Sequence, residues 1–272
     1  MMNLGEIIIN SFKYPARDFK KFLLICLLFA LPIIPVFAFI TIGDYFEILA
    51  VLFLLLAVID ILIIPGYFIS VVGKGCNQSE SVPPIKLGRN IINTFKFAIL
   101  EFIYGLVPFF VFIIGIFASA YFSFSQTTFD VLLDSISNFI TSFLIVLIIT
   151  ILVSFIFSLL SCVATARFAH FNKLRAAFKN IIGDIKEIGV LKLLLWFIVM
   201  GIVTSLITII SVLLIFIPYA GIVIYLAVLI PYLMMVYYYS LGLLYSNVGG
   251  ADDDDFDLDE FEKEIQVIKM MY

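Results

Sequence analysis

Long apolar stretches separated by short polar segments dominate this chain of 272 residues. A helix needs about 20 consecutive apolar residues to cross the hydrocarbon core of a bilayer. Six stretches approach or exceed that length, at residues 22–42, 48–72, 98–122, 139–164, 192–215 and 218–245. The last two are separated only by the region around Pro218, so a tight turn must join them. The pattern predicts an all-α integral membrane protein with six transmembrane helices.

Composition supports lipid as the solvent for these stretches. Apolar residues make up 64% of the chain and charged residues 13%, whereas a soluble domain is about half apolar and about a quarter charged. A core built from 272 residues could not bury so much apolar surface. The first apolar stretch follows 21 amphipathic residues and lacks a small-residue cleavage site, so we expect no signal peptide.

Basic residues predict the orientation of the chain in the membrane. All 16 Lys and Arg fall in the N-terminal segment, in the second and fourth connections with their flanks, or in the C-terminal tail. The other three connections carry no basic residue, and they hold the acidic residues Asp44 and Glu47 in the first and Asp130 and Asp134 in the third. Because basic loops stay in the cytoplasm, we expect a multi-pass protein of the cell membrane with both termini cytoplasmic.

An internal repeat divides the chain further. The sequence LGEIIINSFK at residues 4–13 returns 83 positions later as LGRNIINTFK at residues 87–96, with seven of ten residues identical. Phe178-Lys179 lies another 83 positions on. Self-similarity at a fixed period indicates repeated supersecondary units. We therefore predict a triplicated unit of about 83 residues within a membrane domain at 1–248, with copies at 1–83, 84–166 and 167–248.

Each copy is expected to begin with a basic amphipathic helix on the cytoplasmic side, lying in the plane of the membrane interface. Pro15, Gly88 and Gly189 offer bends that would separate these helices from the spans. The alternative is that each amphipathic stretch simply extends the following span. In-plane helices would place basic side chains among lipid headgroups, and the candidates are Lys13, Arg17, Lys86, Arg89, Lys96, Arg167, Lys173, Arg175 and Lys179.

Asp60 is the candidate for chemistry inside the membrane. It lies near the middle of the second apolar stretch, which holds no other formal charge. Ionisable residues in such positions are costly and often mark an ion or proton path; a merely tolerated carboxyl group is the alternative. His170, the only histidine, lies in a basic connection without a second ligand nearby, and an ordinary surface role is the simpler interpretation.

Other classes of function lack a sequence signal. There is no phosphate-binding glycine loop, no metal-ligand motif and no arrangement of acid, base and nucleophile. We therefore expect no enzymatic activity, no metal, no cofactor and no nucleic-acid partner. Nine of the 20 acidic residues lie in the tail at 249–272, which could engage a protein partner or simply remain a solvated cytoplasmic tail.

Several short motifs follow one another in a recognisable order. Phe12-Lys13-Tyr14-Pro15 with Asp18 is followed by Gly66-Tyr67, by Pro83 in a polar loop, and by the sequence IYGLVP at residues 103–108. This order resembles the uncharacterised archaeal multi-pass membrane family known as domain of unknown function 4013, and Arg167-Phe168-Ala169 with Ala177-Phe178 resembles its second half. One departure is the loop sequence Pro83-Pro84-Ile85, where the family tends to have an acidic residue and Trp. The resemblance covers most of the chain up to about Gly242. It implies a membrane protein from an archaeon and supplies no activity.

Two functional hypotheses remain. The first is a membrane-organising protein that binds lipids or a protein partner through its basic helices and acidic tail. The second is a transporter or channel for an apolar, lipid-like or proton-coupled substrate, with a pathway near Asp60. The scarcity of charge within the apolar stretches favours the first.

Overall fold

The computed structural model describes residues 2–33, 35, 46–124, 132–217 and 220–248. Every regular element in these segments is helical, which confirms the all-α prediction. The α-helices are α1 (Leu4–Arg17), α2 (Phe19–Ala30), α4 (Phe46–Cys76), α5 (Leu87–Phe124), α6 (Leu132–Phe171), α7 (Ile181–Ile188), α8 (Val190–Val212), α9 (Ala220–Ile224) and α10 (Ile230–Tyr245). Shorter helical turns are η2 (Ala176–Phe178), η3 (Leu213–Phe216) and the π-helical η4 (Tyr225–Leu229).

Five helical stretches among the described residues are long and apolar enough to cross a membrane: Glu47–Cys76, Leu87–Ser123, Ser135–Phe171, Val190–Ser211 and Ala220–Tyr245. They match five of the six expected spans. The remaining one, at 22–42, begins in α2, whose 12 residues extend about 18 Å. Residues 34 and 36–42 of that span lie outside the described residues, as does the acidic tail at 249–272.

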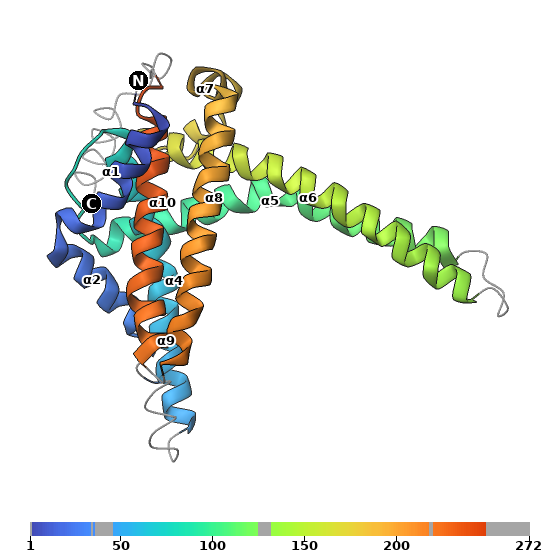
Figure 1. Ribbon diagram of the computed structural model, residues 1–272, viewed down its shortest axis with the longest axis horizontal. Coiled ribbons are helices and arrows are strands. Elements are labelled where there is room, and N and C mark those ends of the chain that lie inside the picture. The colour runs from blue at the N-terminus through green and yellow to red at the C-terminus, as the bar shows by residue number, and fades with distance from the viewer. Residues whose placement is uncertain (1, 34, 36–45, 125–131, 218–219, 249–272) are drawn as a thin grey trace, which may run out of the picture.

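The long helices form two groups (Figure 1). Helices α4, α8 and α10 run side by side, while α5 and α6 pair with each other and extend away from that group at a large angle. Helix α4 joins the groups because it packs against both α5 and α10. The α5–α6 hairpin therefore leaves the group formed by α4, α8 and α10.

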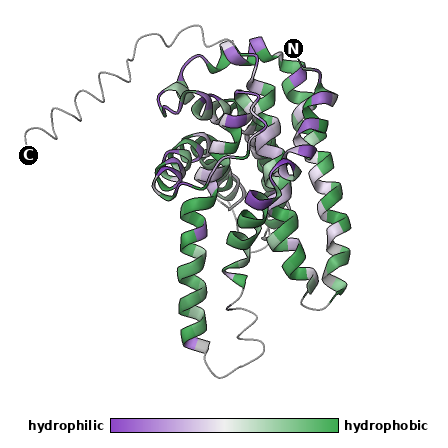
Figure 2. Cartoon of the chain, turned by 90° about the vertical axis from the view of Figure 1, so that its left-hand side faces the viewer, coloured by the Kyte–Doolittle hydropathy of each residue, from purple (hydrophilic) through white to green (hydrophobic). Residues whose placement is uncertain are grey.

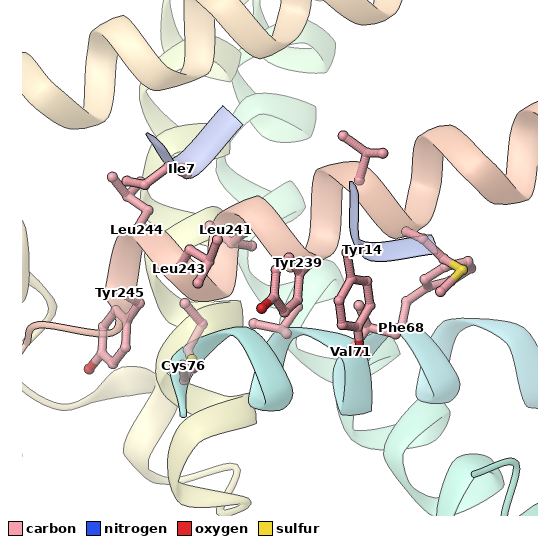
Figure 3. Packing of buried hydrophobic residues seen from close by; sticks show 14 of the residues in the cluster. Ile7, Tyr14, Phe68, Val71, Cys76, Tyr239, Leu241, Leu243, Leu244 and Tyr245 are labelled. Carbon is pink, nitrogen blue, oxygen red and sulfur yellow. The ribbon is translucent and has the colours of Figure 1, made fainter. Parts of the chain in front are cut away.

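The core lies where α1 crosses α4 and α10 (Figure 3). Ile7 and Tyr14 of α1 are fully buried there, with Tyr14 beside Phe68 and Val71 of α4 and Ile7 beside Leu244 of α10. The ring of Tyr14 stacks on that of Tyr239 with centroids 3.7 Å apart. Aromatic side chains therefore dominate the packing of the N-terminal helix, and each contributes a large apolar area.

The three expected amphipathic segments differ from one another. Helix α1 continues through Pro15 and ends at Arg17, and the Asp18 carboxylate then accepts the Lys21 backbone N–H at the start of α2. The break therefore comes three residues after the expected position. Helix α7 is separated from α8 by Gly189, whose φ of 90° favours glycine. The second segment is continuous with α5, so there the alternative of a simple extension describes the structure.

Hydrophilic residues gather toward the end of the molecule where the N-terminus lies, and the shafts of the long helices are mostly apolar (Figure 2). Large apolar side chains such as Phe109, Phe117, Ile148 and Ile202 are exposed along these shafts. An exposed apolar surface of this extent is normal only against lipid or another protein. The molecule thus has one polar end and a long apolar body.

Candidate functional site

A cavity of about 400 Å³ opens at the polar end of the molecule. Its walls come from the last turns of α4, the loop at 77–86, the first turns of α5 and the end of α6. The lining residues are Ile69, Ser70, Gly73, Lys74, Asn77, Ser79, Pro83, Pro84, Lys86, Arg89, Asn90, Asn93, Ala169, His170 and Asn172. The site therefore joins segments that are 100 residues apart in the sequence.

The charges on the cavity wall are all of one sign. Lys74, Lys86 and Arg89 line it, and no Asp or Glu is among the lining residues. Helix α5 also begins at Leu87, beside these cations, and the N-terminus of a helix carries a partial positive charge. Such a wall attracts anions and disfavours cations.

Asn90 and Asn93 supply the polar donors of the α5 wall. Their side chains are 1% and 2% exposed, and the Nδ2 of each has no hydrogen-bond acceptor in the structure. A buried donor without a partner costs about 1–3 kcal/mol. Both residues line the cavity, so an acceptor located there would relieve that cost.

Close contact between α4 and α5 explains why these amides are buried. A Cβ added to Gly66 would lie 1.8 Å from the backbone oxygen of Asn90, so only glycine allows this approach. The Gly66 N–H donates to Oγ1 of Thr94 at 2.8 Å. Asn90, Asn93 and Thr94 therefore face α4.

Helices α1 and α2 hold the loop at 77–86 that forms one wall of the cavity. Arg17 forms an ion pair with Glu80 at 2.9 Å, and Nζ of Lys21 donates to the Val82 carbonyl at 2.7 Å. The Tyr14 hydroxyl donates to the Ser81 carbonyl at 3.3 Å. Burial raises the pKa of the Tyr14 phenol well above its usual range, so this hydroxyl keeps its proton and remains a donor.

Two further contacts fix the same loop from other helices. Nζ of Lys74 in α4 donates to Oγ of Ser81 at 3.1 Å, and the Tyr239 hydroxyl of α10 donates to the Ser79 carbonyl at 3.4 Å. The wall is thus anchored from α1, α2, α4 and α10 at once. A pre-formed wall of this kind favours binding because little chain entropy is lost when a ligand enters.

Arg167 lies elsewhere than expected. The sequence suggested a lipid-headgroup contact, but its side chain is buried and its Nη1 lies 2.7 Å from Oδ1 of Asp184 in α7. Its Nε donates to the Ala176 carbonyl at 2.9 Å, and the Tyr245 hydroxyl donates to Oδ2 of Asp184 at 2.7 Å. Burying a charge requires such a set of partners, so Arg167 joins α6, α7 and α10 instead of facing lipid.

The other basic candidates do not share one site. Of the nine, only Lys86 and Arg89 line the cavity. Lys13 and Arg17 are exposed on α1, and Lys96 lies further along α5. The remaining candidates lie between α6 and α7 around η2, namely Lys173, Arg175 and Lys179.

Asp60 is buried in α4, where its side chain is 7% exposed and Oδ1 has no hydrogen-bond partner. It is not part of the cavity wall. Among the described residues no three His, Cys, Asp or Glu side chains gather as a metal site requires. The structure therefore separates two features, a single buried carboxyl group within the apolar body and a basic cavity at the polar end.

Sequence reasoning missed Lys74, Asn90 and His170 as members of one site. A usable signal was present, because Lys86, Asn90 and Asn93 are spaced by four and three residues and so share a helix face. That face was interpreted as pointing toward headgroups. Only the packing of α4 on α5 shows that part of it is covered.

Comparison with known families gives one match. The family model described as "Protein of unknown function (DUF4013)" matches residues 48–219, which is well over half of the chain. The match begins near the start of α4 and ends after η3, so it includes every segment that lines the cavity. No curated protein and no solved structure matches the chain.

Proposed function

The chain belongs to the DUF4013 family of proteins of unknown function, and we propose that it is a multi-pass membrane protein that binds anionic lipid headgroups at its cytoplasmic face. The observation that carries this proposal is the cavity at the polar end, with its three cations and no carboxylate among its lining residues. In this proposal binding would organise lipids or a partner around the protein.

The position of the cavity relative to the apolar body supports lipid as the ligand. The apolar helices that line it, α4, α5 and α6, are also long enough to enter a bilayer. A cavity at their polar ends would lie at the level of the headgroups, where lipid phosphates are concentrated. Basic pockets between membrane helices on the cytoplasmic side are known to bind lipid headgroups.

The proposal includes the finer architecture expected from the sequence. In it, the chain crosses the cell membrane of an archaeon six times, has both termini in the cytoplasm and contains three copies of an 83-residue unit. This arrangement would place α1 and α7 beside the headgroup layer. Their amphipathic composition supports that placement. The acidic tail at 249–272 would then lie on the same side, where it could bind a basic partner or the protein's own basic segments.

Native mass spectrometry of the gently extracted protein tests lipid binding. The variant Lys86→Gln/Arg89→Gln removes two charges from the cavity, and Lys13→Gln/Lys96→Gln removes two charges outside it. We expect co-purified anionic lipid to be lost from the first variant, by about tenfold in occupancy, and retained by the second. Equal retention by both variants and the wild type would contradict the proposal.

A transport function is the second candidate, and the buried Oδ1 of Asp60 without a partner is the observation that favours it. A carboxyl group that takes up and releases a proton would couple flux to the proton gradient. Asp60→Asn should then abolish proton-coupled uptake into vesicles while leaving lipid retention unchanged. Unchanged uptake, or none in either protein, would leave Asp60 as a structural residue.

A further inference from the structure

We infer that the basic cavity is a site for one phosphate group that carries an organic substituent, bound by Lys74, Lys86, Arg89 and the side-chain amides of Asn90 and Asn93. This inference rests on the proposed function and makes it specific. A diffuse basic surface would hold any anionic lipid, whereas this arrangement selects one chemical group. The argument uses the charges, the unpartnered donors and the size of the cavity.

The charges favour a group that carries more than one negative charge. The three cationic side chains are Lys74 from α4, Lys86 from the loop immediately before α5, and Arg89 from the first turn of α5. Without a carboxylate on the wall, their mutual repulsion is relieved only by an anion or by solvent. A phosphate monoester, at a charge of about −1.5 to −2 near neutral pH, matches this set better than a carboxylate of charge −1.

The unpartnered amides point to oxygen acceptors in the cavity. Nδ2 of Asn90 and Nδ2 of Asn93 are both buried to at least nine-tenths and lack an acceptor in the structure. A phosphate oxygen accepts several hydrogen bonds from different directions. Donors on both α4 and α5 would supply such hydrogen bonds. Because these amides are neutral, binding that depends on them requires directed hydrogen bonds and does not come from charge attraction alone.

The size of the cavity indicates that the phosphate carries a substituent. At about 400 Å³ it is far larger than the roughly 30 Å³ that one water molecule occupies in the liquid. It falls within the range of pockets that hold small organic ligands. Pro83, Pro84 and Ile69 add apolar surface to the wall, which suits a glycerol-like or similar organic group.

The same chemistry could be presented by a lipid headgroup or by a soluble phosphate ester. The test uses the full chain reconstituted in phosphatidylcholine nanodiscs and compares short-chain phosphatidic acid with glycerol 3-phosphate. Octanoate serves as an anion without phosphate. If one phosphatidic acid binds per chain in a saturable way and glycerol 3-phosphate does not bind, the ligand of the site is a lipid. If both bind equally, the ligand is a soluble phosphate ester. Either result supports the site.

Variants that leave the charge of the cavity unchanged test whether the neutral amides contribute to binding. Asn90→Ala/Asn93→Ala should weaken phosphate-ligand binding by about tenfold or more. Asn10→Ala, which changes the equivalent of Asn93 in the first repeat on α1, should leave binding unchanged. Arg89→Gln changes an exposed residue, so we expect it to fold, and it decides the test if the double variant fails to fold.

Three results would overturn the inference. The first is that no phosphate ligand binds, and the second is that octanoate binds as well as the phosphate ligands. The third is that the folded asparagine variant, or folded Arg89→Gln, keeps wild-type affinity. Such a result does not decide the proposed function. If Lys86→Gln/Arg89→Gln loses anionic lipid while the asparagine variant retains it, general lipid binding stands and the phosphate site does not.

Discussion

Glycine residues decide how closely the helices of this protein approach. A Cβ on Gly75 of α4 would lie 2.6 Å from the Tyr239 carbonyl oxygen and 2.8 Å from the Cα of Gly242 in α10. These obstacles are backbone atoms, so they cannot move aside as a flexible side chain would. Gly105 of α5 has no atom within 4 Å of its Cβ position. Glycine therefore has a packing role at position 75 and none at position 105.

We predict that Gly75→Ala lowers the free energy of unfolding by about 1–3 kcal/mol, because α4 and α10 must separate to admit the methyl group. Gly105→Ala should leave stability unchanged or raise it slightly, since alanine favours helix by about 0.5–1 kcal/mol over glycine. Thermal unfolding in the same detergent measures both. Similar melting temperatures for the two variants would show that α4 and α10 do not approach this closely.

The buried ion pair between Arg167 and Asp184 is the second feature at this scale. Asp184→Ala leaves the Arg167 guanidinium buried without its carboxylate, so we expect a loss of about 3–5 kcal/mol. Tyr245→Phe removes one hydrogen bond to Asp184 and should cost about 1–3 kcal/mol. Denaturant unfolding measures the two losses. A smaller loss in Asp184→Ala than in Tyr245→Phe would contradict the burial of this pair.

At the scale of elements, α1 is bound to the rest of the molecule through Tyr14. Its ring stacks on Tyr239, and its hydroxyl donates to the Ser81 carbonyl of the cavity loop. An amphipathic pattern identified α1 but gave it a lipid-facing role. The structure instead buries Ile7 and Tyr14 against α4 and α10, which makes α1 a support for the loop.

We predict that Tyr14→Ala costs about 3–5 kcal/mol, because it empties a fully buried aromatic site. Tyr14→Phe keeps the ring and should cost about 0.5–1.5 kcal/mol for the lost hydrogen bond. Chemical unfolding at neutral pH measures both variants. Equal stability of the alanine variant and the wild type would mean that α1 is not docked on α10.

The pH dependence of Tyr14→Phe gives an independent test. Burial raises the pKa of Tyr14 in the folded chain above the value of about 10 for an unfolded tyrosine. The stabilisation from this shift is complete below pH 10 and decreases as the pH rises further, because the unfolded chain then ionises first. Wild-type stability should therefore fall more steeply than that of Tyr14→Phe between pH 10 and 11. Parallel curves would contradict the burial of this hydroxyl.

At the scale of the whole molecule, the α5–α6 hairpin is the least expected feature. If α4, α8 and α10 cross the membrane, the α5–α6 hairpin in the arrangement of Figure 1 lies parallel to the membrane plane and does not cross it. The positive-inside pattern instead places the α5–α6 connection on the outer face. The position of Ser123, at the end of the apolar stretch of α5, separates these two arrangements.

We predict that Ser123→Cys reacts with a membrane-impermeant maleimide in intact cells, whereas Lys13→Cys reacts only after lysis. The native background should be low because Cys26 and Cys76 are buried and Cys162 is partly buried. Labelling is detected by a mass shift on a gel. Reaction of Ser123→Cys only after lysis would show that α5 and α6 do not cross the membrane, and would favour the sideways hairpin.

Sequence alone determined the features that depend on composition and local spacing. Long apolar stretches identify helices that need lipid, and five of the six expected spans were found because backbone hydrogen bonding in lipid allows few alternatives. The break at Gly189 also follows from local chemistry, whereas the break expected at Pro15 lies at Asp18, three residues later. Lys86 and Arg89 were identified as candidates from the charge pattern.

Only the tertiary structure decided which faces are covered. The partner of Arg167 lies 17 residues away on another helix, and the buried amides of Asn90 and Asn93 face α4 because Gly66 admits α5 so closely. Periodicity defines the face of a helix but not what packs against it, since that depends on contacts between distant segments. The cavity exists only where α4, the loop at 77–86, α5 and α6 meet, and no single stretch of sequence contains it.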